Sequence, residues 1–137
     1  MNYILWNDKD SCGVEKIDNE HKALINIIND LNRCLLDNAG KAKQLETMEC
    51  LLKKLEEHIV TEEEPMRIYD YKEKEFHTAE HMSFYIFVKD AYEKIKSENN
   101  ELNDKMIETF AKRIYNHMVG IDKEYGEFLL ENGYGGR

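Results

Sequence analysis

The sequence predicts an all-α protein, an up-down-up-down antiparallel four-helix bundle with an N-terminal arm. Three observations support this fold class. Apolar residues recur at steps of three and four along four long stretches, which is the spacing of amphipathic helices. One proline and seven glycines leave these stretches largely uninterrupted. The linkers between them are short, which forces consecutive helices to run antiparallel.

The first two predicted helices have clear start and stop signals. The first follows Asp18, which we expect to act as its N-cap, and ends near Asn38 and Gly40. The second begins at about Lys41, and Pro65 is expected to kink it or to mark its end. The apolar stripes are Leu24, Ile28, Leu31 and Leu35 in the first helix, and Met48, Leu52, Leu55 and Ile59 in the second.

The second half of the chain repeats this pattern. The third predicted helix spans about Lys72 to Ser97, and the fourth follows Asn99 and Asn100. Their stripes are Phe84, Val88 and Ile95 in the third, and Leu102, Met106, Phe110, Ile121 and Phe128 in the fourth. The prediction is one domain over residues 1–137. It includes an arm over 1–17 that packs Trp6 back on the bundle, and a flexible, glycine-rich tail over 132–137.

Composition narrows the class of protein further. The chain has 137 residues and a formal charge of −9, which repels nucleic acids and anionic membrane surfaces. No stretch approaches the roughly 18 apolar residues of a membrane span, and no signal-peptide pattern is present, so we expect a cytoplasmic protein. Cys12, Cys34 and Cys50 lack CxxC or zinc-finger spacing and are expected to be reduced packing thiols.

Histidines extend the apolar stripes of the predicted helices. Every histidine falls on an inward face: His21, His58, His77, His81 and His117. Glu62 follows His58 by four residues, and His81 follows His77 by four, so each pair can present neighbouring ligand atoms to one ion. A single inward histidine is more often a hydrogen-bonded core residue. Burying five without compensation would cost several kcal/mol per group, so the sequence predicts a metal centre inside the bundle.

Asp122 is a ligand candidate at an unusual spacing. It follows His117 by five residues, which is about 140° of rotation on a regular α-helix. A regular helix would direct it to solvent as an ordinary surface acid. We predict instead a π-bulge near Gly120, which would turn Asp122 inward.

These residues, in this order, resemble the hemerythrin family over nearly the whole chain, and the short chain is similar to the single-domain bacterial members, the bacteriohemerythrins. An HxxxE or HxxxH alone arises often by chance, but all seven ligand positions at family-like separations are highly specific. The resemblance rests on Trp6, Gly13, Ile17, Asp18, Asn19, Glu20, His21, His58, Glu62, Glu63, Met66, Tyr71, His77, His81, Phe84, Asn116, His117, Asp122 and Tyr125.

The resemblance implies a non-haem di-iron centre that binds dioxygen reversibly for oxygen storage, buffering or delivery, without catalysis. It assigns His77, His81 and His117 to one iron and His21 and His58 to the other, with Glu62 and Asp122 bridging both. It further implies two iron ions as Fe2+ or Fe3+, an oxo or hydroxo bridge, and one open position for dioxygen on the iron with two histidines.

Residues around the expected open position depart from the commoner family pattern. Ile114, three residues before His117, resembles an apolar oxygen-pocket residue, although core packing explains it equally well. Arg113 stands where tryptophan is frequent, Ile59 where phenylalanine often follows the histidine, and Lys72 where proline is common. If Arg113 admits water, autoxidation is expected to be fast.

Several neighbours are expected to support the ligands. Glu20, Glu63 and Glu80 are within sequence reach of the second ring nitrogen of a ligand histidine, although most of them are expected to be solvated. Tyr71 and Tyr125 are expected to pack near the site.

Other functions and metals stay open at this level. The same site could belong to a di-iron enzyme that acts on nitric oxide, peroxide or dioxygen, with a supply of electrons. It could also belong to a ligand-dependent sensor with a separate partner. Zinc and manganese also suit histidine and carboxylate ligands.

Overall fold

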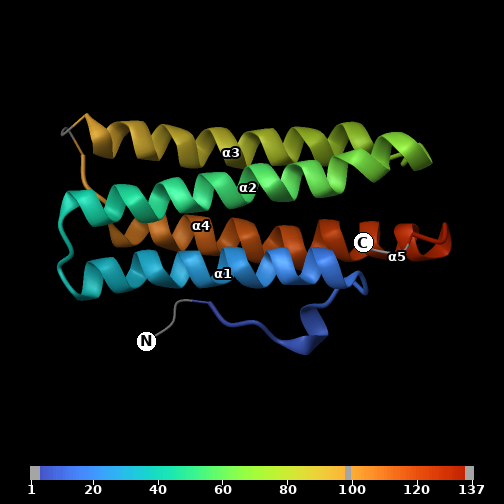
Figure 1. The fold of residues 1–137 in the computed structure, drawn as a ribbon, viewed down its shortest axis with the longest axis horizontal. Coiled ribbons are helices and arrows are strands. Elements are labelled where there is room, and N and C mark those ends of the chain that lie inside the picture. Colours follow the sequence, from blue (N-terminus) through green and yellow to red (C-terminus); the bar gives the residue numbers. More distant parts are fainter. Residues whose placement is uncertain (1–3, 98–99, 135–137) are drawn as a thin grey trace.

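The computed structural model describes residues 4–97 and 100–134. In this part of the chain, four helical rods pack side by side, and consecutive rods run in opposite directions (Figure 1). The first three rods are α1 (Glu15–Leu36), α2 (Lys41–Tyr69) and α3 (Lys74–Lys96). The fourth consists of α4 (Asp104–Asn116), the π-helix η2 (His117–Asp122) and α5 (Lys123–Glu131). The predicted four-helix bundle is confirmed.

The first helix begins before the predicted N-cap. α1 starts at Glu15, so Asp18 lies within its first turn, and the prediction that Asp18 caps the helix is wrong. The Asp18 carboxylate instead accepts hydrogen bonds from the Ser11 hydroxyl and, at 2.9 Å, from the Cys12 N–H. Asp18 therefore ties the N-terminal arm to α1.

Pro65 does not mark the end of α2. The helix continues to Tyr69 and ends at Asp70, whose φ of 53° is in the left-handed region. Proline has no N–H to donate to the Thr61 carbonyl, but its side chain is buried within the bundle. The packing of the buried ring therefore compensates for the missing hydrogen bond to Thr61, and the helix continues.

The last rod begins later than predicted. Asn103 caps α4 by accepting a hydrogen bond from the Met106 N–H at 2.9 Å. Leu102 is buried but precedes the helix. Asn99 lies outside the described residues, and α3 begins at Lys74 rather than at Lys72.

Two apolar clusters divide the core. The larger cluster joins all four rods and includes Ile28, Leu31, Met48, Val88 and Phe110. The smaller cluster includes Ile17, Met66, Tyr71, Tyr125 and Leu129. Along the chain, the candidate metal ligands of each rod lie between residues of these two clusters, although Tyr71, the smaller-cluster residue before His77, precedes α3.

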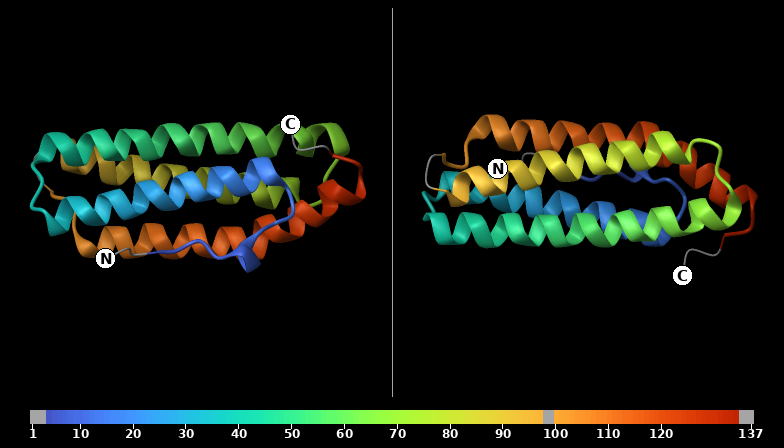
Figure 2. Two further views of the ribbon diagram at one scale, coloured as in Figure 1. Left: turned by 60° about the horizontal axis from the view of Figure 1, so that its bottom comes forward. Right: turned by 90° about the horizontal axis from the view of Figure 1, so that it is seen from above.

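The N-terminal arm folds back along the bundle (Figure 2, left). The Asn29 side chain exchanges hydrogen bonds of 3.0 and 2.7 Å with the backbone of Ile4. Trp6 is partly buried against the larger cluster, as predicted. Further along the arm, the Lys123 ammonium group donates a hydrogen bond of 2.6 Å to the Lys9 carbonyl. The arm is therefore fixed to both the first and the last rod.

The beginning of the tail is also anchored. The Tyr134 N–H donates to the Leu129 carbonyl at 2.9 Å, and its ring lies edge-on to Tyr69 at 6.4 Å between centroids. Tyr134 therefore contacts the end of the last rod; the flexibility of the tail over 132–137 stays a prediction, and residues 135–137 lie outside the described part.

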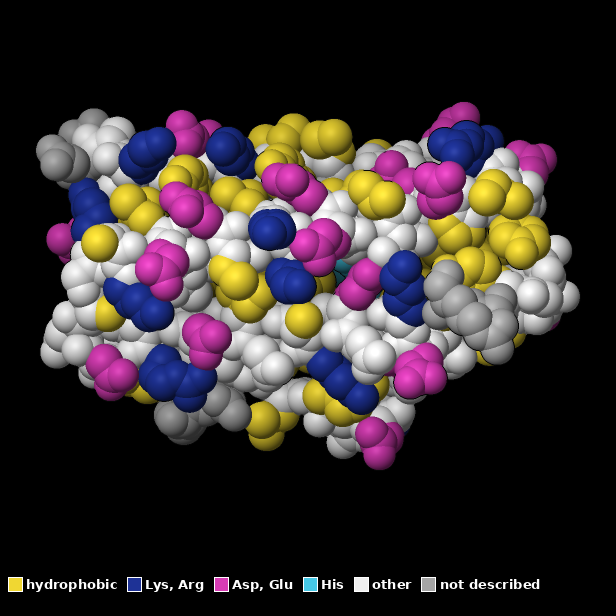
Figure 3. Space-filling view, viewed as in Figure 1, with side chains coloured by type: hydrophobic (Ala, Val, Ile, Leu, Met, Phe, Trp, Pro, Cys, Tyr) yellow, Lys and Arg dark blue, Asp and Glu magenta, His cyan; other side chains and the backbone are white. Residues whose placement is uncertain are grey.

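The surface is strongly charged. Figure 3 shows acidic and basic side chains interspersed over one face, with only a small patch of histidine surface visible. None of the described helices is long and apolar enough to cross a membrane.

Candidate metal centre

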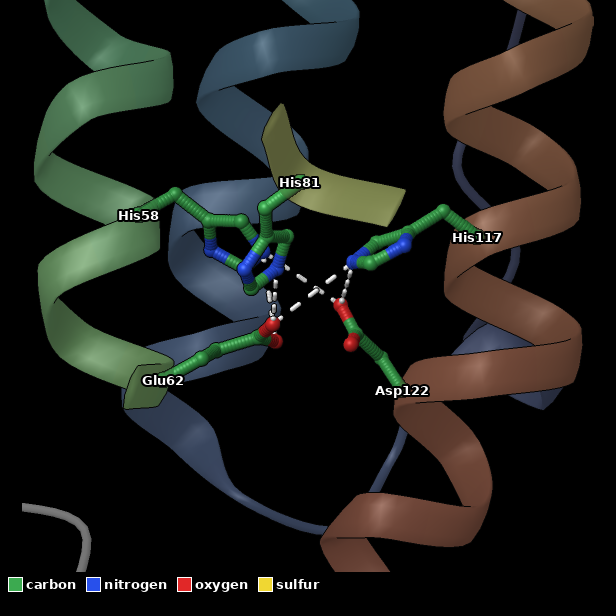
Figure 4. A group of neighbouring side chains, drawn as sticks. All are labelled: His58, Glu62, His81, His117 and Asp122. Atoms are coloured by element: carbon green, nitrogen blue, oxygen red, sulfur yellow. Dashed lines mark hydrogen bonds and ion pairs between the residues drawn. The ribbon is translucent and has the colours of Figure 1, made fainter. Parts of the chain in front are cut away.

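All seven predicted ligand residues meet between the rods. The contributors are His21 from α1, His58 and Glu62 from α2, His77 and His81 from α3, and His117 and Asp122 from η2. Six of them are buried and His117 is partly exposed. Figure 4 shows the side chains of five members pointing toward one another. Ligand atoms from these five, His58, Glu62, His81, His117 and Asp122, lie within 4.8 Å of one another.

The two oxygens of Glu62 face different histidines. Oε1 lies 2.9 Å from Nε2 of His77 and 2.8 Å from Nε2 of His81. Oε2 lies 3.2 Å from Nε2 of His58. One Glu62 oxygen therefore faces the two histidines of α3, and the other faces the histidine of α2.

Asp122 makes a similar division. Oδ1 lies 2.9 Å from Nε2 of His77. Oδ2 lies 2.6 Å from Nε2 of His21 and 3.3 Å from Nε2 of His58. His117 approaches both carboxylates, with Nε2 at 3.0 Å from Oδ2 of Asp122 and at 3.6 Å from Oε1 of Glu62.

The predicted π-bulge is present. η2 spans His117–Asp122, and its wider turn brings two residues spaced by five onto the inner face of one rod. Asp122 is fully buried, so the interpretation as a surface acid is wrong. Gly120 is exposed, and a Cβ built on it would meet no atom within 4 Å.

Two candidate ligand histidines contact carboxylates that lie nearer the surface. Nδ1 of His58 lies 2.8 Å from Oε1 of Glu20, and Nδ1 of His81 lies 2.8 Å from Oε2 of Glu63. These contacts fix the ring orientation and aim each Nε2 into the site. Sequence reasoning missed Thr61, whose hydroxyl donates to the other Glu20 oxygen at 2.6 Å. Its position three residues after His58, on the same side of α2, was the available signal.

Two tyrosines close the end of the site near the smaller cluster, as predicted. The Tyr125 hydroxyl donates a hydrogen bond of 2.6 Å to the Glu62 carbonyl. Its ring centroid lies 5.1 Å from that of His77 and 4.8 Å from that of Tyr71. These contacts hold α2, α3 and α5 together next to the ligands.

The buried charges depend on one another. Burial alone would lower the pKa of His58, but the Glu62 charge and the hydrogen bonds that the ring donates to its carboxylate neighbours raise it well above its usual value. Burial alone would raise the pKa of Glu62, but the surrounding histidines, His58 first, hold it well below its usual value. Both carboxylates therefore stay charged inside the bundle, and positive charge nearby stabilises them.

The donor atoms fit a cation. Six buried side-chain atoms have no hydrogen-bond partner: Nδ1 of His21 and His77, Nε2 of His58 and His117, Oε2 of Glu62, and Oδ1 of Asp122. Four of these atoms, Nε2 of His58 and His117, Oε2 of Glu62 and Oδ1 of Asp122, lie at the contacts between histidines and carboxylates inside the cluster. Buried groups of this kind are costly unless something pairs with them. Imidazole nitrogens and carboxylate oxygens are ligands for iron, zinc and manganese, so a metal would satisfy this cluster.

A pocket leads from the surface to the cluster. Its lining includes three candidate ligands, His58, His81 and His117, and the apolar side chains of Leu55, Phe84 and Ile114. Ile59, Glu80 and Arg113 complete the lining and are partly exposed, so they mark its mouth. The cavity of about 30 Å³ has room for a ligand of two or three atoms.

The fold and this cluster define a helical metal-binding protein with a buried histidine and carboxylate centre. The model of the hemerythrin HHE cation binding domain matches residues 12–129. The chain therefore belongs to the hemerythrin family, and its site is a hemerythrin-like metal site.

Individual relatives agree with this assignment. Myohemerythrin from Theromyzon tessulatum is 32% identical over 120 residues, covering 88% of each chain. Bacteriohemerythrin from Aquifex aeolicus is 34% identical over 116 residues, covering 82% of this chain and 87% of that protein. Crystal structures of hemerythrin mutants match the fold with a TM-score of 0.87 at 22% identity, covering 93% of this chain and 97% of theirs.

Proposed function

We propose that this protein binds dioxygen reversibly at a di-iron centre and stores, buffers or delivers oxygen. One observation carries the proposal: the two oxygens of each buried carboxylate face different histidines, as a bridge between two metal ions requires. The relatives named myohemerythrin and bacteriohemerythrin support the same class.

The proposed ligand assignment follows this division. Histidines at Oε1 of Glu62, namely His77, His81 and His117, would hold one iron. Three histidines lie near Oδ2 of Asp122, and two of them, His21 and His58, would hold the other. His117 lies toward both groups, and the family resemblance places it with His77 and His81. When bound, the iron pair would supply reversible two-electron chemistry for dioxygen.

The pocket suits an uncharged diatomic ligand. Leu55, Phe84 and Ile114 form an apolar wall beside the histidines, which limits the water that can enter. Ile114 is 3% exposed and also lines the pocket. Both interpretations made from the sequence, core packing and pocket lining, are therefore compatible with its position.

Absorption spectroscopy tests this proposal. Protein reconstituted anaerobically with ferrous iron should bind about two irons per chain. On exposure to dioxygen it should develop a ligand-to-iron charge-transfer band that disappears on deoxygenation and returns over repeated cycles. Fewer than about two irons, or immediate irreversible conversion to the ferric form, would contradict the proposal.

One residue favours the alternative of a di-iron enzyme. Glu80 lines the pocket, so an acid group is available there to deliver a proton to a bound substrate. If the protein consumes dioxygen, peroxide or nitric oxide with added reductant, Glu80→Gln should lower turnover by about tenfold or more. Reversible binding without turnover would leave oxygen carriage as the function.

Arg113 at the mouth bears on how long oxygen stays bound. It replaces a bulky apolar side chain with a polar one, and water entry promotes autoxidation. Arg113→Trp should therefore slow the decay of the oxygenated form in stopped-flow measurements. Equal decay rates in the two proteins would show that water entry at Arg113 does not limit the lifetime.

A further inference from the structure

Arg113 differs from the other described arginines in its contacts. Arg33 and Arg67 each pair with an acidic residue three positions earlier, at 2.6 and 2.8 Å. Arg113 makes no ion pair with any carboxylate in residues 4–97 and 100–134. Its charge is therefore not neutralised by a direct contact, in a chain whose formal charge is −9.

Aromatic and hydroxyl contacts hold the Arg113 guanidinium in place. Nη2 donates a hydrogen bond of 3.0 Å to the Ser83 hydroxyl. The guanidinium carbon lies 5.2 Å from the ring centroid of Phe84 and 5.7 Å from that of Phe87, which are cation–π distances. These neighbours position the group without cancelling its charge, and its remaining N–H groups are free of ion pairs.

This cation lines a pocket that leads to the candidate ligands. Arg113 lines the same pocket as His58, His81 and His117, and it is one of the partly exposed residues at the mouth. Charges that line a narrow cleft with low-dielectric walls act more strongly on an entering ion than charges on an open surface. Glu80 is the opposing charge in this lining, so the two residues act in opposite directions on an anion.

We propose that Arg113 speeds the entry of small monovalent anions of two or three atoms into this pocket, which also admits uncharged ligands, by drawing the anions toward the metal centre. This inference rests on the proposed function in one respect: it assumes that the pocket leads to a bound metal. The cavity of about 30 Å³ sets the size of the ligand, and the unpaired guanidinium sets its charge.

Azide is a suitable probe because it is a linear monovalent anion of three atoms. The association rate of azide is measured on oxidised, iron-loaded protein, and that of nitric oxide, a neutral ligand, on reduced protein. Arg113→Gln should lower the ratio of the azide rate to the nitric oxide rate about tenfold. Arg113→Lys should keep most of the wild-type ratio because it keeps the charge. Glu80→Gln should raise the azide rate, since it removes the opposing charge.

Ionic strength separates a charge effect from a change in pocket shape. The azide rate of the wild-type protein should fall as salt screens the guanidinium, and this dependence should weaken in Arg113→Gln. An unchanged ratio and salt dependence in Arg113→Gln would overturn the proposal while leaving oxygen binding intact. Failure of the wild-type protein to bind iron would instead contradict the proposed function.

A second measurement does not need iron. In zinc-loaded protein, the Arg113 Nε–H signal in 15N NMR should shift on titration with azide, and the signals of Arg33 and Arg67 should not. If zinc does not bind, the same titration on the metal-free protein applies. Absence of a selective shift at saturating azide would overturn the proposal.

Discussion

Two rods of the bundle contain a residue that commonly interrupts a helix, and only one is interrupted. α2 contains Pro65 and still runs without a break from Lys41 to Tyr69. The last rod contains Gly120 and changes to a π-helix over six residues. The difference follows the spacing of the candidate ligands, which are four residues apart on α2 and five apart on η2. The helix type of each rod therefore brings both of its candidate ligands to the inner face.

The largest expected effect comes from removing either buried carboxylate. Glu62→Gln on the regular helix and Asp122→Asn on the π-helix should each weaken metal binding by at least about 100-fold, because each oxygen pair faces histidines on two sides. Metal content after competition with a chelator measures this loss. Glu64→Gln, an exposed acid on α2, is the matched control and should keep full metal content. A full metal content in Asp122→Asn would show that the π-helix does not serve the ligands.

The pH dependence of the metal-free protein tests the same two segments. The Asp122 charge outweighs the burial that alone would lower the pKa of His117, and raises it to about 9 from 6.5. The stability that protonated His117 contributes is therefore fully present below about pH 6.5 and lost as the pH rises through about 9. Glu62 and Asp122 have lowered pKa values, so their contribution is lost as the pH falls below their usual values of 4.5 and 3.8.

Metal-free protein should accordingly be most stable between about pH 4.5 and 6.5, and should lose up to about 3 kcal/mol of unfolding free energy by pH 10. Urea unfolding at a series of pH values measures the curve. Metal-loaded protein is the comparison, and its stability should change less because the metal replaces the protons. A metal-free protein that gained stability above pH 7 would contradict this assignment of charges.

The segment after the π-helix is expected to be sensitive to side-chain size. A Cβ at Gly126 would lie 2.1 Å from the Cys12 carbonyl oxygen, which is backbone and cannot rotate away. Gly126→Ala should therefore destabilise the protein by about 2 to 3 kcal/mol in thermal or urea unfolding.

Gly120→Ala is the matched control within the same rod. Nothing lies within 4 Å of a Cβ at Gly120, so this change should leave stability within about 1 kcal/mol of wild type or raise it slightly. Loss of metal binding in Gly120→Ala would mean that glycine itself is needed for the π-helix. Retention would mean that burial of Asp122 and docking of α5 maintain it.

The smallest expected effect is at Pro65. Pro65→Ala restores an N–H that can donate to the Thr61 carbonyl, at the loss of some buried ring surface. The net result should be a gain of about 1 kcal/mol in the free energy of unfolding, with unchanged metal content. A clear loss of stability would show that the buried ring contributes more than the missing hydrogen bond.

The sequence predicted the bundle and the positions of the ligands because both depend on local spacing. Steps of three and four placed Leu24, Met48, Val88 and Phe110 in the core, and all four are buried or nearly so. The same steps placed the histidines inward. The spacing of five between His117 and Asp122 left a ligand on a π-bulge and a surface acid equally open, and the resemblance to the hemerythrin family favoured the ligand. Helix ends were less predictable, because Asp18 found partners in the arm and Pro65 was held by packing.

By itself, the sequence determined which residues face inward, since that depends on the rotation per residue along each helix. The tertiary structure alone decided what those residues meet. It set which carboxylate oxygen faces which histidine, how closely Cys12 approaches Gly126, and that Arg113 stacks on aromatic rings without an acidic partner. These contacts join residues far apart in the chain, so they depend on how the rods pack and not on any local period.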